Sequence, residues 1–187
     1  EIAPDNLLAA GMLGHILGDY DKLNHAIQQM ALCCQKANNF ADCWNDLGRL
    51  HGFAGNYDAA QRAFRKALEI NPTFRDARIN LAVALGESGQ PGAALKELDR
   101  LDHKGLRGHY YAGCFHQLQG SFAEAYSEFQ MATVIRAEYH DLSKRLEHLG
   151  VYFSKIEALV QMHRNYLARH PAFPDLHFKL AELYFQM

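Results

Sequence analysis

Apolar residues recur along most of the chain at steps of three and four positions, which is the spacing of one face of an α-helix. The clearest stretch runs from Ala41 to Phe74. Its first half places Trp44, Leu47 and His51 on one side of a predicted helix. Asp46 and Arg49 lie between these positions, so the pattern indicates an amphipathic helix that buries one face.

A second amphipathic helix follows within the same stretch. Gly55 and Asn56 interrupt the first helix, and Gly48 leaves room for the second helix to approach the backbone of the first. The second apolar stripe consists of Tyr57, Ala60, Phe64 and Ala67. It ends at Pro72, which lacks an amide hydrogen and cannot continue a helix. The stretch therefore predicts a helical hairpin.

Weaker copies of this hairpin fill the rest of the chain. One helix pair cannot bury its apolar stripes alone, so consecutive pairs are expected to stack. The predicted units lie near residues 4–40, 41–74, 75–105, 106–139 and 140–173, with a partial unit at 174–187. We expect them to form a single domain over residues 1–187, with about eleven helices at two per unit.

The unit at 140–173 departs most from the pattern. Glu147 stands where a small residue is expected, and Tyr166 stands where alanine is expected. We still expect a helix pair in this unit, with a long second helix from Tyr152 to His170.

The order of large and small residues in 41–74 resembles the tetratricopeptide repeat, a helix-turn-helix unit of about 34 residues. The likeness rests on Trp44, Leu47, Gly48, Gly55, Tyr57, Ala60, Phe64, Ala67 and Pro72. The unit at 106–139 repeats much of it with Gly113, Gly120, Phe122 and Phe129. This resemblance, to tetratricopeptide-repeat proteins of the bacterial type, implies an all-α fold. That fold is an α-solenoid of stacked antiparallel helix pairs in a right-handed superhelix, with about five and a half repeats here.

The charge of the chain gives no reason to expect nucleic acid as a partner. The formal net charge is -2 and no basic stripe is present, whereas binding to nucleic acid or to an anionic membrane depends on clustered Lys and Arg. No apolar run approaches the roughly 20 residues that span a bilayer, so membrane insertion is not expected. The chain begins without Met and stops inside a helical pattern, so we interpret it as a fragment of a longer chain.

The four cysteines show no spacing typical of a metal site or a redox motif. They are Cys33, Cys34, Cys43 and Cys114. Free cysteine is often buried as a small apolar residue, so we expect reduced, packed thiols. This usage favours a reducing compartment and a cytoplasmic location.

Candidate chemistry is weak. The eleven histidines include no HExxH motif and no pair four residues apart, so no metal site is predicted. His51 and His116 fall at the same position of their units, and we expect both to be hydrogen-bonded between helices. Glu124 and Glu128 share a helix face that we expect to be solvated. No nucleophile or phosphate-binding motif is present, so we predict no catalytic residue, no cofactor and no enzyme.

The resemblance implies that the first helix of each unit lines a concave groove. The residues carried onto this groove are Asn45, Arg49, Phe53, Ile79, Asn80, Val83, Arg107, Tyr110, Cys114 and Leu118. This row is largely apolar with basic points, so we expect it to bind a peptide or helix of a partner protein. The alternative is that adjacent helices, or a part of the chain missing from this sequence, cover several of these residues.

Two other roles stay open at the level of the sequence. Repeats of this type serve as substrate-recognition arms of larger enzymes such as some glycosyltransferases, where inward Asn residues recur, and here Asn80 fits that pattern. The chain could also self-associate through the open end of its last helix pair, because an unfinished stack exposes an apolar face.

Overall fold

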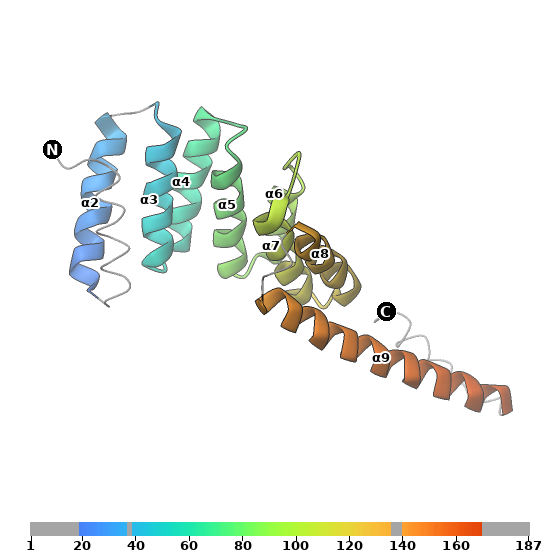
Figure 1. Ribbon diagram of the computed structural model, residues 1–187. Coiled ribbons are helices and arrows are strands. Elements are labelled where there is room, and N and C mark those ends of the chain that lie inside the picture. The colour runs from blue at the N-terminus through green and yellow to red at the C-terminus, as the bar shows by residue number, and fades with distance from the viewer. Residues whose placement is uncertain (1–18, 37–38, 136–139, 170–187) are drawn as a thin grey trace. The chain divides into compact units, whose positions relative to one another are not determined.

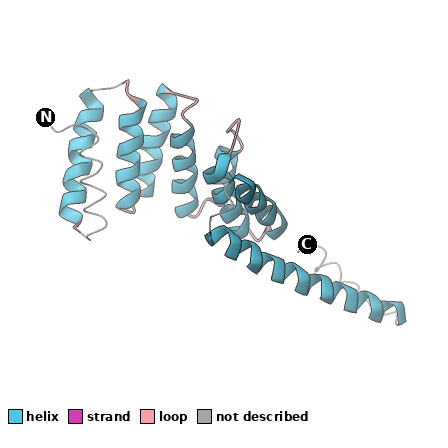
Figure 2. Ribbon diagram, viewed as in Figure 1, coloured by secondary structure: helices cyan, strands magenta, loops and turns pink. Residues whose placement is uncertain are grey.

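The computed structural model describes residues 19–36, 39–135 and 140–169. Figures 1 and 2 show helices joined by short turns, and no strand occurs in these residues. The helices are α2 (Tyr20–Lys36), α3 (Ala41–Phe53), α4 (Tyr57–Ile70), α5 (Arg75–Glu87), α6 (Pro91–Leu98), α7 (Gly105–Leu118), α8 (Phe122–Ile135) and α9 (His140–Arg169). The predicted all-α fold is confirmed.

The chain forms two compact units, at residues 1–103 and 104–187. The described part of the N-terminal unit holds α2 to α6, and that of the C-terminal unit holds α7 to α9. Within each unit, helices that follow one another in sequence pack together as in an α-solenoid. The predicted repeats at 41–74, 75–105 and 106–139 each contain one helix pair, whereas the predicted first helix of 4–40 and the partial unit 174–187 lie outside the described residues.

Three glycines make the same turn between the two helices of a pair. Gly55, Gly89 and Gly120 have φ angles of 73°, 80° and 78°, in the left-handed region that favours glycine. In the first turn, the amide of Gly55 donates to the carbonyl of Gly52 at 3.0 Å and the amide of Asn56 donates to that of His51 at 2.9 Å. The other two turns contain the equivalent bonds. Each first helix therefore ends in a Schellman motif.

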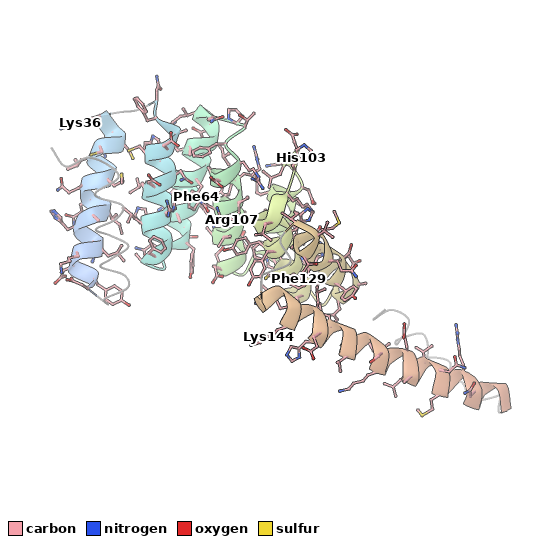
Figure 3. The ribbon with its side chains drawn as sticks, in the orientation of Figure 1. Lys36, Phe64, His103, Arg107, Phe129 and Lys144 are labelled. Carbon is pink, nitrogen blue, oxygen red and sulfur yellow. The ribbon has the colours of Figure 1, made fainter. Side chains whose placement is uncertain are left out.

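A small residue on the first helix meets a large residue on the second. A Cβ atom added at Gly48 would lie 2.5 Å from the ring of Phe64, and one added at Gly113 would lie 2.5 Å from the ring of Phe129. Figure 3 shows both rings on the second helices of their hairpins. The α5–α6 hairpin has Ala82 and Leu98 at these positions, and both are fully buried. The close approach predicted at Gly48 is confirmed.

The helix pair predicted for 140–173 is wrong, because residues 140–169 form one helix of 30 residues, α9. Ser154 of α9 stands at the position that Gly55, Gly89 and Gly120 occupy in the hairpins. Serine has no preference for the left-handed backbone of the turn, so nothing local ends the helix there. The apolar periodicity correctly indicates helical structure, but it does not mark a break.

Candidate functional site

The predicted binding residues lie on the first helices of three hairpins. Residues of α3 and α5 belong to the N-terminal unit, and residues of α7 belong to the C-terminal unit. Positions are counted from the first residue of each repeat, at 41, 75, 106 and 140.

Two of the predicted residues in the N-terminal unit are buried. Asn45 and Ile79, both at repeat position 5, are 7% and 1% exposed. Ile79 is therefore a core side chain, and its predicted place on a binding surface is wrong. Asn45 is covered as well, because the amide of Asn80 donates to its Oδ1 at 2.9 Å from the next first helix, α5. Position 5 thus serves contact within the stack, as the alternative interpretation anticipated.

The remaining predicted residues of this unit are partly exposed. They are Arg49, Phe53, Asn80 and Val83. Arg49 pairs with Asp46 at 3.3 Å, one helical turn earlier on α3. Phe53 also packs against the core cluster formed by α2, α3 and Ala63 of α4. The accessible row of this unit is therefore a mixture of one cation, one amide and two apolar side chains.

The C-terminal unit contains a hollow on α7. Its volume is about 240 Å³, and its lining consists of Leu106, Arg107, Tyr110 and Tyr111. The rings of Tyr110 and Tyr111 meet edge to face, with centroids 5.4 Å apart. Arg107 of α7, labelled in Figure 3, has an exposed side chain. The structure thus brings two predicted residues, Arg107 and Tyr110, to one aromatic depression with a basic side chain beside it.

The other two predicted residues of α7 lie further along the helix. Cys114 is partly buried and packs against the core cluster of α8 and α9. Leu118, in the last position of α7, is 70% exposed. Leu118 is therefore an exposed apolar side chain that a partner could contact. Cys114 is only partly accessible, because it also packs against the core.

Arg145 of α9 belongs to this surface and is missed by sequence reasoning. Its guanidinium lies 5.4 Å from the centroid of the Tyr110 ring and 5.8 Å from that of Phe129. It also donates to Oε1 of Gln117 at 3.3 Å. Arg145 stands at repeat position 6, as Asn80 does, and each contacts position 5 of the preceding repeat. That equivalence was the available signal.

Comparison with known proteins assigns the repeat. The family model described as Tetratricopeptide repeat matches residues 54–114. Residues 54–114 are thus a tetratricopeptide-repeat segment. No match was found among curated protein sequences.

Solved structures agree on the fold of this repeat protein. PilW, a type IV pilus biogenesis factor, has a TM-score of 0.66 at 16% identity, over 98% of this chain and 86% of that one. The thermophilic TPR protein TTC0263 of Thermus thermophilus has a TM-score of 0.62 at 18% identity, over 98% and 100%. The first repeat domain of Spaghetti (RPAP3), bound to an HSP90 peptide, has a TM-score of 0.58 at 14% identity, over 61% and 93%.

Polar clusters in this chain join helices. Glu128 of α8 accepts from Nζ of Lys104 at 2.7 Å and lies 2.7 Å from Nδ1 of His109. Its side chain is 17% exposed, so its predicted solvated position is wrong. The Nδ1 atoms of His51 and His116 are buried without a hydrogen-bond partner, so the bond predicted for these rings is not found at that atom.

Proteins built from this repeat are typically non-catalytic scaffolds for protein interactions. Within residues 19–36, 39–135 and 140–169, no group of three or more His, Cys, Asp or Glu residues is arranged to hold a metal ion. No helix in the described part of the chain combines the length and apolar content needed to cross a bilayer.

Proposed function

We propose that this repeat protein binds a peptide or helix of a partner protein along its first helices. The observation that carries the proposal is the hollow of α7, where Tyr110 and Tyr111 form an aromatic wall beside Arg107. Depressions lined by aromatic side chains accept the anchor residues of a peptide, and such anchors supply most of the binding energy. Leu118 extends the apolar surface along the same helix.

The side chains of the hollow suit a peptide that has an apolar anchor next to an acidic residue. An apolar anchor would pack on the rings of Tyr110 and Tyr111, and a carboxylate would pair with Arg107. The RPAP3 domain of similar fold is itself a peptide complex, which supports the general mode of binding for this chain. Arg49 places a second basic side chain on the accessible row of the N-terminal unit.

A phage-displayed library of random peptides, selected on the immobilised chain, tests the proposal. Selected peptides are measured by fluorescence polarisation against the wild type, Leu118→Asp and Arg107→Glu. We expect each variant to weaken binding by about tenfold or more, because anchor contacts are worth over about 1 kcal/mol each. We also expect acidic residues to be enriched in the selected peptides.

Val134→Asp is the matched control. Val134 lies on α8 and is 83% exposed, so it resembles Leu118 in size and exposure but belongs to a second helix. Binding should be unchanged in this variant. Equal weakening in Val134→Asp and Leu118→Asp, or none in Leu118→Asp, would place the peptide on another face.

Self-association is a second candidate, and the exposed apolar residues of α9 favour it. Val151, Leu159 and Met162 are 49%, 42% and 57% exposed. Apolar surface of this kind is a common site of contact between copies. Sedimentation at two protein concentrations tests it, and a mass that stays monomeric in the wild type at both concentrations counts against the idea. Leu159→Asp should shift any dimer to monomer.

A further inference from the structure

Three sulfur atoms meet in the core between α2 and α3. Sγ of Cys34 lies 2.7 Å from Sγ of Cys43, and Sγ of Cys43 lies 3.8 Å from Sδ of Met30. All three side chains belong to the same buried cluster. Cys34 is in the last turn of α2 and Cys43 is in the first turn of α3, so the two thiols bring together consecutive helices at their connection.

The distance between the two thiols decides what the pair can do. Two thiolates on one tetrahedral zinc ion, each about 2.3 Å from the metal, stand about 3.8 Å apart. At 2.7 Å the two sulfur atoms leave no room for an ion between them. A covalent sulfur-sulfur bond, at about 2.05 Å, needs only a small further approach. The geometry thus favours a cross-link over a metal site.

We propose that Cys34 and Cys43 form a disulfide that joins α2 to α3 when the chain meets a small-molecule disulfide such as oxidised glutathione. The Cys34 thiolate attacks one glutathione sulfur and releases one glutathione thiolate, which leaves a mixed disulfide on Cys34. The Cys43 thiolate then attacks Sγ of Cys34 and releases the second glutathione. The protein loses two hydrogens, and one oxidised glutathione becomes two reduced molecules.

Burial sets when this reaction takes place. Cys34 and Cys43 are 0% and 7% exposed, and desolvation raises the pKa of both thiols. Few thiolates are therefore present in the folded chain at neutral pH, and an external disulfide reaches them slowly. The bond forms during folding or when α2 and α3 separate. Once formed, it is shielded from reductants by the same burial.

The neighbouring Cys33 supplies the matched control. It precedes Cys34 on α2 but is only partly buried, and it is packed at the edge of the same cluster. A cross-link that depends on geometry should involve Cys34 and spare Cys33. A link set only by proximity in the sequence would use either residue.

The experiment refolds the full chain from urea in mixtures of oxidised and reduced glutathione and digests it with trypsin. Cys33 and Cys34 fall in the peptide 23–36, and Cys43 falls in the peptide 37–49, so a cross-link joins two peptides. We expect the joined species in the wild type and in Cys33→Ala, and at least a tenfold lower yield in Cys34→Ala. The thermal midpoint of the oxidised wild type should exceed that of the reduced chain by about 5 °C or more.

Two results would overturn the proposal. One is a joined species that persists in Cys34→Ala. The other is an equilibrium constant for the cross-link in the folded wild type that is no higher than that of the same chain kept in urea. The second comparison uses the wild type alone, so it decides the matter even if Cys34→Ala fails to fold. For a native-like pair we expect the folded value to be about thirtyfold higher or more.

Discussion

Residues 105–135 and 140–169 have similar lengths and helical apolar patterns, yet they fold differently. The first forms the α7–α8 hairpin and the second forms the uninterrupted helix α9. Both belong to the C-terminal unit. Both segments are helical throughout, apart from the turn. A small number of positions must therefore decide that the first segment turns back on itself and the second does not.

The turn is the first of these positions. Gly120 has a φ of 78°, its amide donates to the carbonyl of Gln117, and the amide of Ser121 donates to that of His116. In α9, Ser154 stands at the same repeat position, and its hydroxyl donates to the carbonyl of Val151 within the helix. The left-handed backbone costs a residue with a side chain about 1 kcal/mol or more, so the helix continues.

The second of these positions is the one where the two helices of the hairpin touch. Gly113 lets the ring of Phe129 lie against the backbone of α7, whereas α9 has Glu147 at the position of Gly113. A carboxylate cannot be buried there without a partner. A hairpin of this kind therefore needs both a left-handed glycine and a small residue facing a large one, and an amphipathic stripe supplies neither.

The largest expected effect comes from removing the small residue. Gly48→Ala places a Cβ 2.5 Å from the ring of Phe64, which is buried and must move. We expect a loss of about 2 to 3 kcal/mol in the free energy of unfolding, measured by urea denaturation with circular dichroism. Phe64→Leu added to Gly48→Ala should restore part of this loss, because the natural α5–α6 hairpin combines Ala82 with Leu98.

Gly52→Ala is the control in the same helix. A Cβ at Gly52 meets nothing within 4 Å, and Gly52 lies near the end of α3 with an ordinary backbone. Alanine there should be neutral or should stabilise by up to about 1 kcal/mol, because glycine is the poorer helix former. Similar losses of unfolding free energy in Gly48→Ala and Gly52→Ala would show that the close contact with Phe64 is not the cause of the loss.

Two smaller effects, opposite in sign to each other, are expected at the turn position of the hairpin and the equivalent position of α9. Gly120→Ala should lower the free energy of unfolding by about 1 kcal/mol, because alanine is strained at a φ of 78°. Ser154→Ala, at the same repeat position in α9, should raise it by a few tenths of a kcal/mol, because alanine is the better helix former. Urea denaturation of both variants checks the signs. A loss at both positions would indicate a turn at Ser154 and contradict a continuous α9.

The sequence predicts the hairpins because their turn signals are local. Glycine at the left-handed position, followed by an aromatic or proline two residues later, marks Gly55, Gly89 and Gly120 without knowledge of the fold. The prediction fails over 140–169 because it places the boundaries there by repeat length and apolar spacing. Those features persist in a helix that does not turn, and the absence of glycine at Ser154 was the signal against a pair.

The candidate surface is less predictable than the fold. Repeat position alone places Arg107, Tyr110 and Leu118 on accessible surface of α7, but it also places Ile79 on such a surface, where the structure buries it. Whether a side chain at position 5 is covered depends on which residue the first helix of the following repeat places against it. Asn80 reaches Asn45, and Arg145 reaches Tyr110. Such a contact joins residues 35 apart in the chain and has no local sequence signature.

The smallest expected effect concerns the imidazole ring of His51, which belongs to the α3–α4 hairpin. His51 stands at the repeat position where α9 has Gly150. Burial, and to a lesser extent the charge of Arg62, lowers the pKa of His51 below its usual value near 6.5. Its buried Nδ1 has no hydrogen-bond partner, so a second N–H on the ring would have no acceptor.

The sign of the pH dependence follows from that lowered pKa. The unfolded chain takes up a proton on His51 more readily than the folded chain does. The free energy of unfolding is therefore highest above about pH 6.5 and declines as the pH falls from 6.5 toward the folded pKa. His51→Phe, which removes the titrating group, should flatten this part of the curve when urea midpoints are compared between pH 8 and pH 5. A slope unchanged by the substitution would mean that the decline comes from other groups. Because Gly150 cannot titrate, any pH dependence at this repeat position belongs to the hairpin and not to α9.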